Sequence, residues 1–112
     1  MYRKLGRETR KRRSILSSLT KDVLITGHVV TTEARAKEVR KFVDRMISYG
    51  KKGTLVSRRK ALAFLNNDSV LVKKLFDEIA PKYKDRNGGY TRIIKIKERI
   101  GDDALQVRLE LV

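Results

Sequence analysis

The chain has 112 residues, enough for one domain with a modest core, and it carries a formal net charge of +15. It contains no cysteine, which excludes a disulfide framework and a cysteine-based zinc site. We find no secretory signal and no apolar run long enough to span a bilayer, so we expect a soluble, cytoplasmic protein. The charge exceeds what solubility requires and indicates an anionic partner: nucleic acid, an anionic membrane surface or an acidic protein.

Residues 1–13 form a predicted basic arm, in which only Glu8 opposes the cations. The cations are Arg3, Lys4, Arg7, Arg10, Lys11, Arg12 and Arg13. The arm has too few apolar side chains to order itself, so we expect it to fold only on a polyanion, with its guanidinium groups on phosphates. The alternative is a localisation signal or a solvated tail, because short basic runs are unspecific. We expect a single α+β domain to occupy residues 14–112.

Apolar periodicity predicts a helix over 9–26, with Gly27 as its left-handed cap, then a short strand over 28–31. The apolar stripe of this helix consists of Ile15, Leu16, Leu19, Val23 and Leu24. A second helix is predicted over 32–49 and is expected to break at residues 50–53. Its inward residues are Ala36, Val39, Val43, Met46 and Ile47, with Phe42 on the flank.

A third, shorter helix is predicted over 54–65, with Leu55, Leu62 and Leu65 facing inward and Phe64 as a further candidate for this core face. A fourth begins at Asp68 or Ser69 and is expected to end at Pro81. Its inward residues are Val72, Leu75, Phe76 and Ile79.

Two strands are predicted over 90–97 and 104–112, with a turn at 101–103 between them. The second alternates cleanly, so that Leu105, Val107, Leu109 and Leu111 share one face. We expect these strands to pair antiparallel, with the short strand near Val29 at a sheet edge. The predicted fold class is α+β, with about four helices on one face of a sheet of about three strands.

Further cations lie inside the domain. The second helix carries Arg35, Lys37, Arg40, Lys41 and Arg45 off its apolar stripe, and Glu33–Lys37 is an i,i+4 pair. A merely solvated helix face is the alternative for these residues. Arg58, Arg59 and Lys60 are adjacent, so they cannot share one helical face.

The loop over 85–92 is the most specific candidate contact. Gly88 and Gly89 permit close approach of the backbone to a partner, and Tyr90 can stack on a base or sugar. The candidate RNA-binding residues here are Arg86, Asn87, Gly88, Gly89, Tyr90 and Arg92. The alternative is an ordinary turn with a half-buried tyrosine.

Little in the sequence supports catalysis. His28 is the sole histidine, and Asp102–Asp103 lie in a predicted turn where they are poorly placed to share a metal. No phosphate-cradling glycine motif is present. We therefore expect no catalytic residues, no metal, no cofactor and no small-molecule substrate.

Five segments carry a resemblance to a known family. They are Arg3-Lys4-Leu5-Gly6-Arg7, residues 31–38 (TTEARAKE), 58–65 (RRKALAFL), 74–81 (KLFDEIAP) and 85–92 (DRNGGYTR). In order and spacing they resemble the bacterial large-subunit ribosomal protein seventeen family over essentially the whole chain. The resemblance implies a structural protein of the large ribosomal subunit that binds large-subunit ribosomal RNA. It also implies neighbouring ribosomal proteins near the peptide exit region.

The chain departs from the family pattern at its start and at Lys11-Arg12 and Ser17-Ser18, which affects individual contacts. We expect ribosomal RNA binding by phosphate neutralisation, with RNA shape and stacking providing site preference. The candidate residues are the seven arm cations, Arg35, Lys37, Arg58, Arg59 and the 86–92 loop. The alternatives are a free-standing architectural DNA-binding protein, which usually needs a symmetric dimer, and a membrane-surface protein, disfavoured by the lack of tryptophan.

Overall fold

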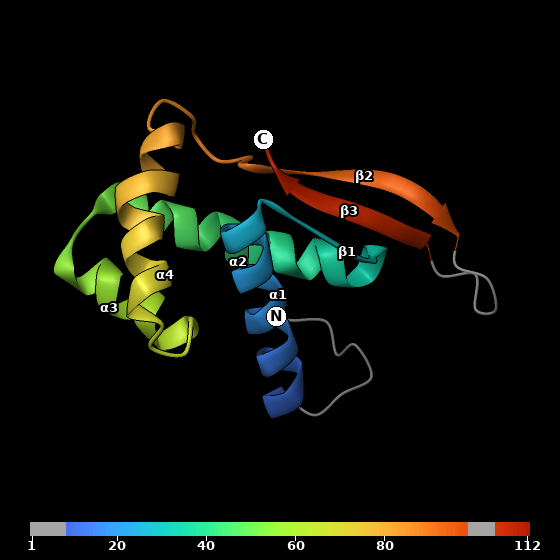
Figure 1. Ribbon diagram of the computed structural model, residues 1–112, viewed down its shortest axis with the longest axis horizontal. Coiled ribbons are helices and arrows are strands. Elements are labelled where there is room, and N and C mark those ends of the chain that lie inside the picture. The colour runs from blue at the N-terminus through green and yellow to red at the C-terminus, as the bar shows by residue number, and fades with distance from the viewer. Residues whose placement is uncertain (1–8, 99–104) are drawn as a thin grey trace.

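The computed structural model describes residues 9–98 and 105–112, and Figure 1 shows their arrangement. The first half contains α1 (Thr9–Thr26), β1 (His28–Thr32), α2 (Glu33–Lys52) and α3 (Leu55–Phe64). The second half contains α4 (Ser69–Lys74), the π turn η1 (Leu75–Ile79), the 3-10 turn η2 (Ala80–Tyr83), β2 (Thr91–Glu98) and β3 (Leu105–Leu111).

The three strands form one antiparallel sheet in the order β1-β3-β2. Leu109 of the central strand pairs with Val29 on one side and Ile93 on the other. The sheet lies along α2, while α3 and α4 gather at the far end of that helix (Figure 1). The predicted α+β class, the antiparallel final strands and the edge position of the first strand are confirmed.

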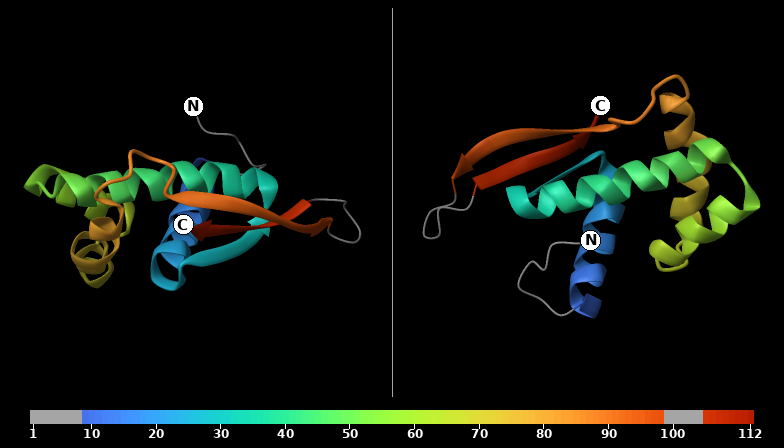
Figure 2. Two further views of the ribbon diagram at one scale, coloured as in Figure 1. Left: turned by 90° about the horizontal axis from the view of Figure 1, so that it is seen from above. Right: turned by 180° about the vertical axis from the view of Figure 1, so that it is seen from behind.

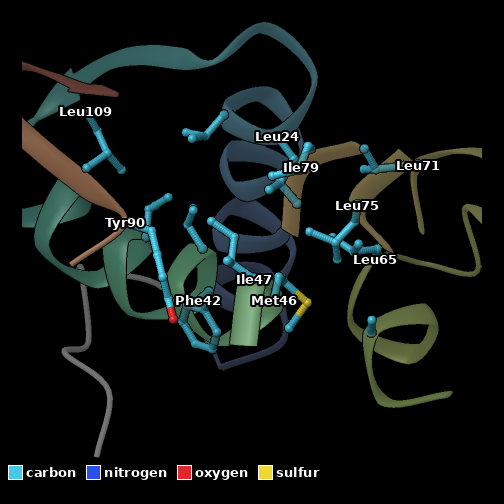
Figure 3. Close-up of a cluster of buried hydrophobic side chains, with 14 of the residues drawn as sticks. Leu24, Phe42, Met46, Ile47, Leu65, Leu71, Leu75, Ile79, Tyr90 and Leu109 are labelled. Carbon is cyan, nitrogen blue, oxygen red and sulfur yellow. The ribbon is translucent and has the colours of Figure 1, made fainter. Parts of the chain in front are cut away.

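Helix α2 is the centre of the molecule, because residues from the sheet, α1, α3, η1 and η2 all pack against it. Figure 3 shows Leu24 of α1, Leu75 of η1 and Leu109 of β3 in one cluster with Met46 and Ile47. Met46 and Ile47 are both at most 1% exposed. Every predicted inward residue of α2 is buried, and Phe42 is buried as well. The α2 stripe therefore behaves as its 3.6-residue period predicts.

Helix α2 extends beyond the predicted break and ends at Lys52. Gly53, at φ 65°, supplies the left-handed cap, and Gly50 lies inside the helix. A Cβ at position 50 would lie 2.6 Å from the Cβ of Ala80, which is closer than real contacts allow. Gly50 therefore lets α2 approach η2 closely. The prediction of a helix break at this position was wrong, because the glycine serves this close contact and does not end the helix.

Two smaller predictions about α3 and α4 are corrected. Leu55 is 63% exposed, because the Thr54–Ser57 capping box turns α3 so that Ser57 and Ala61 face inward. Pro81 does not end a regular helix. The helix already loosens into the π turn at Leu75, and Pro81, which lacks an N–H, sits at the start of η2.

The cations closest to the predicted arm boundary belong to a helix. Helix α1 runs over Thr9–Thr26, which confirms the predicted bounds, so Arg10, Lys11, Arg12 and Arg13 lie on its first turns. The reason is that the apolar stripe of α1 anchors the helix on α2 and supports these preceding turns. The predicted boundary at 13/14 therefore falls inside α1, while Arg3, Lys4, Arg7 and the 101–103 turn lie outside the described residues.

Candidate nucleic-acid interface

A hollow of about 320 Å³ opens between α1, α2 and α3. Its cationic lining comes from all three helices: Arg12 and Arg13 from α1, Arg45 from α2 and Lys60 from α3. Arg13, Arg45 and Lys60 are exposed, whereas Arg12 is 8% exposed and forms part of the wall. Helices distant in sequence thus bring cations together that no single segment displays.

The floor of the hollow is apolar and aromatic. Phe64 at the end of α3 stacks on Phe42 of α2, with ring centroids 4.8 Å apart and an interplanar angle of 12°. The Arg45 guanidinium lies 5.5 Å from the Phe42 centroid, within the range of a cation–π contact. The Ser17 hydroxyl donates to the Phe64 carbonyl at 2.8 Å and fixes α1 against the end of α3.

A second hollow of about 560 Å³ adjoins the first and shares Arg13, Ala63 and Phe64 with it. It extends the lining to Arg10 and Asn66. We call the two hollows together the basic groove. Among the described residues that line the groove, none is a carboxylate. An anion in the groove would therefore meet positive charge without local competition.

The other cations predicted on α2 and α3 lie outside the basic groove. Lys37 pairs with Glu33 at 3.4 Å, which confirms the expected i,i+4 pair, and Arg35 is only half-exposed near the start of α2. Arg58 stacks over Phe76 at 5.0 Å, while its neighbour Arg59 is exposed. Arg58 and Lys60 thus contact different surroundings, in agreement with the prediction that the three adjacent cations do not share one face.

The loop before β2 contains exposed and buried parts. Arg86, Asn87, Gly88 and Gly89 are exposed, and both glycines have left-handed φ values, 81° and 64°. Tyr90 is only 2% exposed, so the alternative of an ordinary turn with a packed tyrosine fits the structure better than a ring open to a base. The ring packs edge-on against Tyr83, at 5.3 Å between centroids, and thereby anchors the loop to the core.

Lys51 of α2 forms hydrogen bonds with the same loop. Its ammonium donates to the Tyr90 hydroxyl at 2.9 Å and to the carbonyl of Arg86. The hydrogen bond from Lys51 to the Tyr90 hydroxyl lowers the pKa of the Tyr90 phenol, whereas burial raises the pKa of the Tyr83 phenol. Because Lys51 is engaged inside the fold, its role here is structural.

Arg92 lies on the outer face of the sheet, the face away from the helices. It is opposite Glu110 in the register and forms an ion pair with it at 3.3 Å. Glu110 also pairs with Arg108 at 3.7 Å. The outer face of the sheet is therefore closer to neutral than the basic groove.

Sequence reasoning placed Arg45 and Lys60 among the cations but not among the site residues. The signal that was available is their position relative to the apolar stripe of each helix. The sequence does not reveal how α1, α2 and α3 pack, and it is this packing that brings the two residues to one groove. Phe64 was seen only as a possible core residue, and it lines both hollows.

In the part of the chain that the structure describes, no group of three or more His, Cys, Asp or Glu residues could hold a metal ion. Within residues 9–98 and 105–112, no helix is long and apolar enough to cross a membrane.

Comparison with known proteins assigns the family. A model of the family described as "Ribosomal protein L17" matches residues 15–112. The chain is 60% identical over 111 residues to the "Large ribosomal subunit protein bL17" of Thermoanaerobacter pseudethanolicus, covering 99% of this chain and 98% of the relative. It is 53% identical to the protein of that name in Ligilactobacillus salivarius, with the same coverage. The chain therefore belongs to the ribosomal protein L17 family.

Proposed function

We propose that this chain, a ribosomal protein of the large subunit, is a structural component that binds large-subunit ribosomal RNA through the basic groove. The observation that carries the proposal is the groove itself. Three helices bring Arg13, Arg45 and Lys60 together with no carboxylate among the described lining residues. Elsewhere on the surface, cations such as Lys37 and Arg92 are paired with acids.

The physical mechanism is phosphate neutralisation. Each cation that engages a phosphate releases condensed counterions, so affinity falls steeply with salt. Arg forks add bidentate geometry that fixes the RNA backbone in register. Arg10 and Lys11 continue the positive charge toward the chain start, where Arg3, Lys4 and Arg7 precede α1. The arm cations are therefore proposed to extend the same RNA contact.

The exposed 86–89 loop is proposed as a second, smaller RNA contact. Arg86 and Asn87 are exposed beside two glycines, at which an added Cβ would meet no atom within 4 Å. Tyr90 and Lys51 hold this loop in place from inside the protein and are not proposed to contact the RNA. Arg59 at the surface of α3 and the Arg35–Lys37 region are proposed as peripheral phosphate contacts.

Neighbouring large-subunit proteins near the exit region are the second proposed partner class. On the outer face of the sheet, Val30 and Ile94 flank Arg108 in register and are 50% and 42% exposed. Membership of the L17 family favours ribosomal RNA over the alternative of a free-standing DNA-binding protein.

The test uses two triple variants of equal charge. The groove variant carries Arg13→Gln, Arg45→Gln and Lys60→Gln; the control variant carries Lys73→Gln, Lys82→Gln and Lys95→Gln, three exposed lysines away from the groove. Each is expressed in a bacterial host depleted of its own L17 protein.

Large subunits are then sedimented and washed at high salt. We expect the wild-type protein and the control variant to remain bound and the groove variant to be lost from the subunit. Equal retention of both variants would contradict the proposal that the basic groove is the main RNA contact. A protein that never sediments with the large subunit would contradict the ribosomal role itself.

A further inference from the structure

The basic groove has an apolar floor that phosphate binding does not require. Phosphates need only donors and positive charge, yet Leu16, Met46 and Ala63 line the groove together with the ring of Phe64. Phe64 is half-exposed, whereas its stacking partner Phe42 is 3% exposed. The groove therefore presents a supported aromatic ring to solvent beside exposed cations.

Phe64 is also held rigidly, as a stacking platform should be. The buried Phe42 ring supports it at 4.8 Å, and the hydrogen bond from Ser17 fixes the Phe64 backbone. The volume of the first hollow, about 320 Å³, lies near the lower end of the roughly 300–1,000 Å³ range of small-molecule sites. A single planar group fits such a space better than a helix or a strand would.

We propose that the basic groove holds one unpaired RNA base against Phe64, with the flanking phosphates on Arg13 and Lys60. The inference rests on the proposed function, because it names the form of RNA that the groove takes. Bases in an A-form duplex are stacked and paired, so only a looped, bulged or single-stranded nucleotide can present its face to the ring. The absence of carboxylates from the described lining favours a polyanion over a protein segment with cationic anchors.

The experiment compares two RNA probes of equal charge: an octamer of adenosines and an octamer of abasic ribonucleotides. Affinities are measured at one low salt concentration by fluorescence anisotropy. Base stacking on an aromatic side chain predicts that wild-type protein binds the adenosine octamer roughly five- to a hundredfold more tightly than the abasic one. Phe64→Leu should lose most of that ratio, and Phe64→Tyr, which keeps a ring, should retain it.

Phe76→Leu is the matched control, because Phe76 is also half-buried and lies under an arginine, but outside the groove. It should keep the wild-type ratio. If wild-type protein binds both octamers equally at low salt, the groove binds phosphates only; the inference fails and the proposed function stands. If neither octamer binds at low salt, both fail.

A second measurement avoids dependence on the folding of Phe64→Leu. Wild-type protein is irradiated with large-subunit ribosomal RNA containing 4-thiouridine, and the crosslinked peptides are identified by mass spectrometry. The inference predicts crosslinks to groove-lining segments of α1, α2 or α3, including the peptide that contains Phe64. Crosslinks confined to other surfaces would overturn it.

Discussion

Asp44 is half-buried on α2, and burial raises the pKa of its carboxyl above the ordinary value of 3.8. The positive charge of Arg40 opposes this effect, with smaller opposing contributions from the Tyr90 backbone and the Thr91 side chain. The folded protein therefore holds this proton more tightly than the unfolded chain. The contribution of Asp44 to stability is full at low pH and falls as the pH rises from 3.8 through the folded pKa.

Asp44→Asn should remove this pH dependence. Relative to wild type, the variant is expected to gain free energy of unfolding as the pH is raised from about 4 to about 7, because only the wild type pays to ionise a partly buried carboxyl. Urea unfolding at both pH values checks the prediction. A stability difference that stays constant, or that shrinks as the pH rises, would contradict it.

Gly88 and Gly89 combine a backbone requirement with open space. Both have left-handed φ values, which cost an ordinary L-residue about 1–2 kcal/mol, and a Cβ at either position would meet no atom within 4 Å. Gly89→Val should therefore destabilise the fold as well as the RNA contact. A valine variant alone cannot separate the two roles.

Asparagine separates them, because it tolerates the left-handed region. Gly89→Asn is expected to leave the melting temperature near that of wild type while weakening RNA binding, since its side chain occupies the space that a close RNA backbone needs. Thermal unfolding and filter binding give the two readouts. Unchanged RNA affinity would mean that the glycines serve only the turn.

At the scale of elements, the contact between α2 and η2 depends on Gly50. In most helix interiors, alanine is roughly 0.5–1 kcal/mol better than glycine. Here the added Cβ would lie 2.6 Å from the Cβ of Ala80, so packing strain outweighs the propensity gain. We expect Gly50→Ala to lower the free energy of unfolding by roughly 1–3 kcal/mol, measured by urea denaturation. A stabilised variant would show that α2 and η2 separate easily.

The central strand β3 has one buried and one open face. Leu109 is fully buried between β1 and β2, so Leu109→Ala should cost about 2–5 kcal/mol of stability. Arg108 is exposed on the other face, and Arg108→Ala should remain within about 0.5 kcal/mol of wild type. Urea unfolding of both variants compares them. A larger loss for Arg108→Ala would invert the assigned faces.

Sequence patterns predicted the helices and strands well, because the face that each element buries depends on residues close together in the sequence. The stripe through Val39, Val43 and Ile47 and the alternation through Val107 and Leu109 both matched the buried faces. Leu55 and Gly50 were misjudged, and Tyr90 was left open between two environments, since these environments depend on residues far away in the sequence. The basic groove is an extreme case: its cations come from three helices, and only their packing brings them together.

At the scale of the whole molecule, positive charge and exposed aromatic surface coincide in one place. The described part of the chain extends over 46 × 30 × 24 Å, with the sheet along one part of α2 and the α3–α4 pair at the other end (Figure 2). On the outer face of the sheet the Glu110 carboxylate pairs with both Arg92 and Arg108, whereas no carboxylate lines the described basic groove. This asymmetry predicts which face of the protein approaches RNA.

The N-terminal arm adds to this charge. Because α1 begins at Thr9, truncation should stop before that residue and leave the helix intact. Deleting residues 1–8 removes Arg3, Lys4 and Arg7, and should flatten the slope of log K against log salt by roughly two to three units if each cation engages one phosphate. An unchanged slope would show that these residues do not contact the RNA.

The most direct test of the central claim is the salt dependence of affinity for large-subunit ribosomal RNA, measured for the wild-type protein, the groove variant and the control variant. If Arg13, Arg45 and Lys60 each neutralise one phosphate, the groove variant should flatten the slope of log K against log salt by roughly two to three units. The control variant should change it by less than about one unit. Equal changes in the two variants would mean that the RNA responds to net charge alone, and would contradict a dedicated RNA-binding groove.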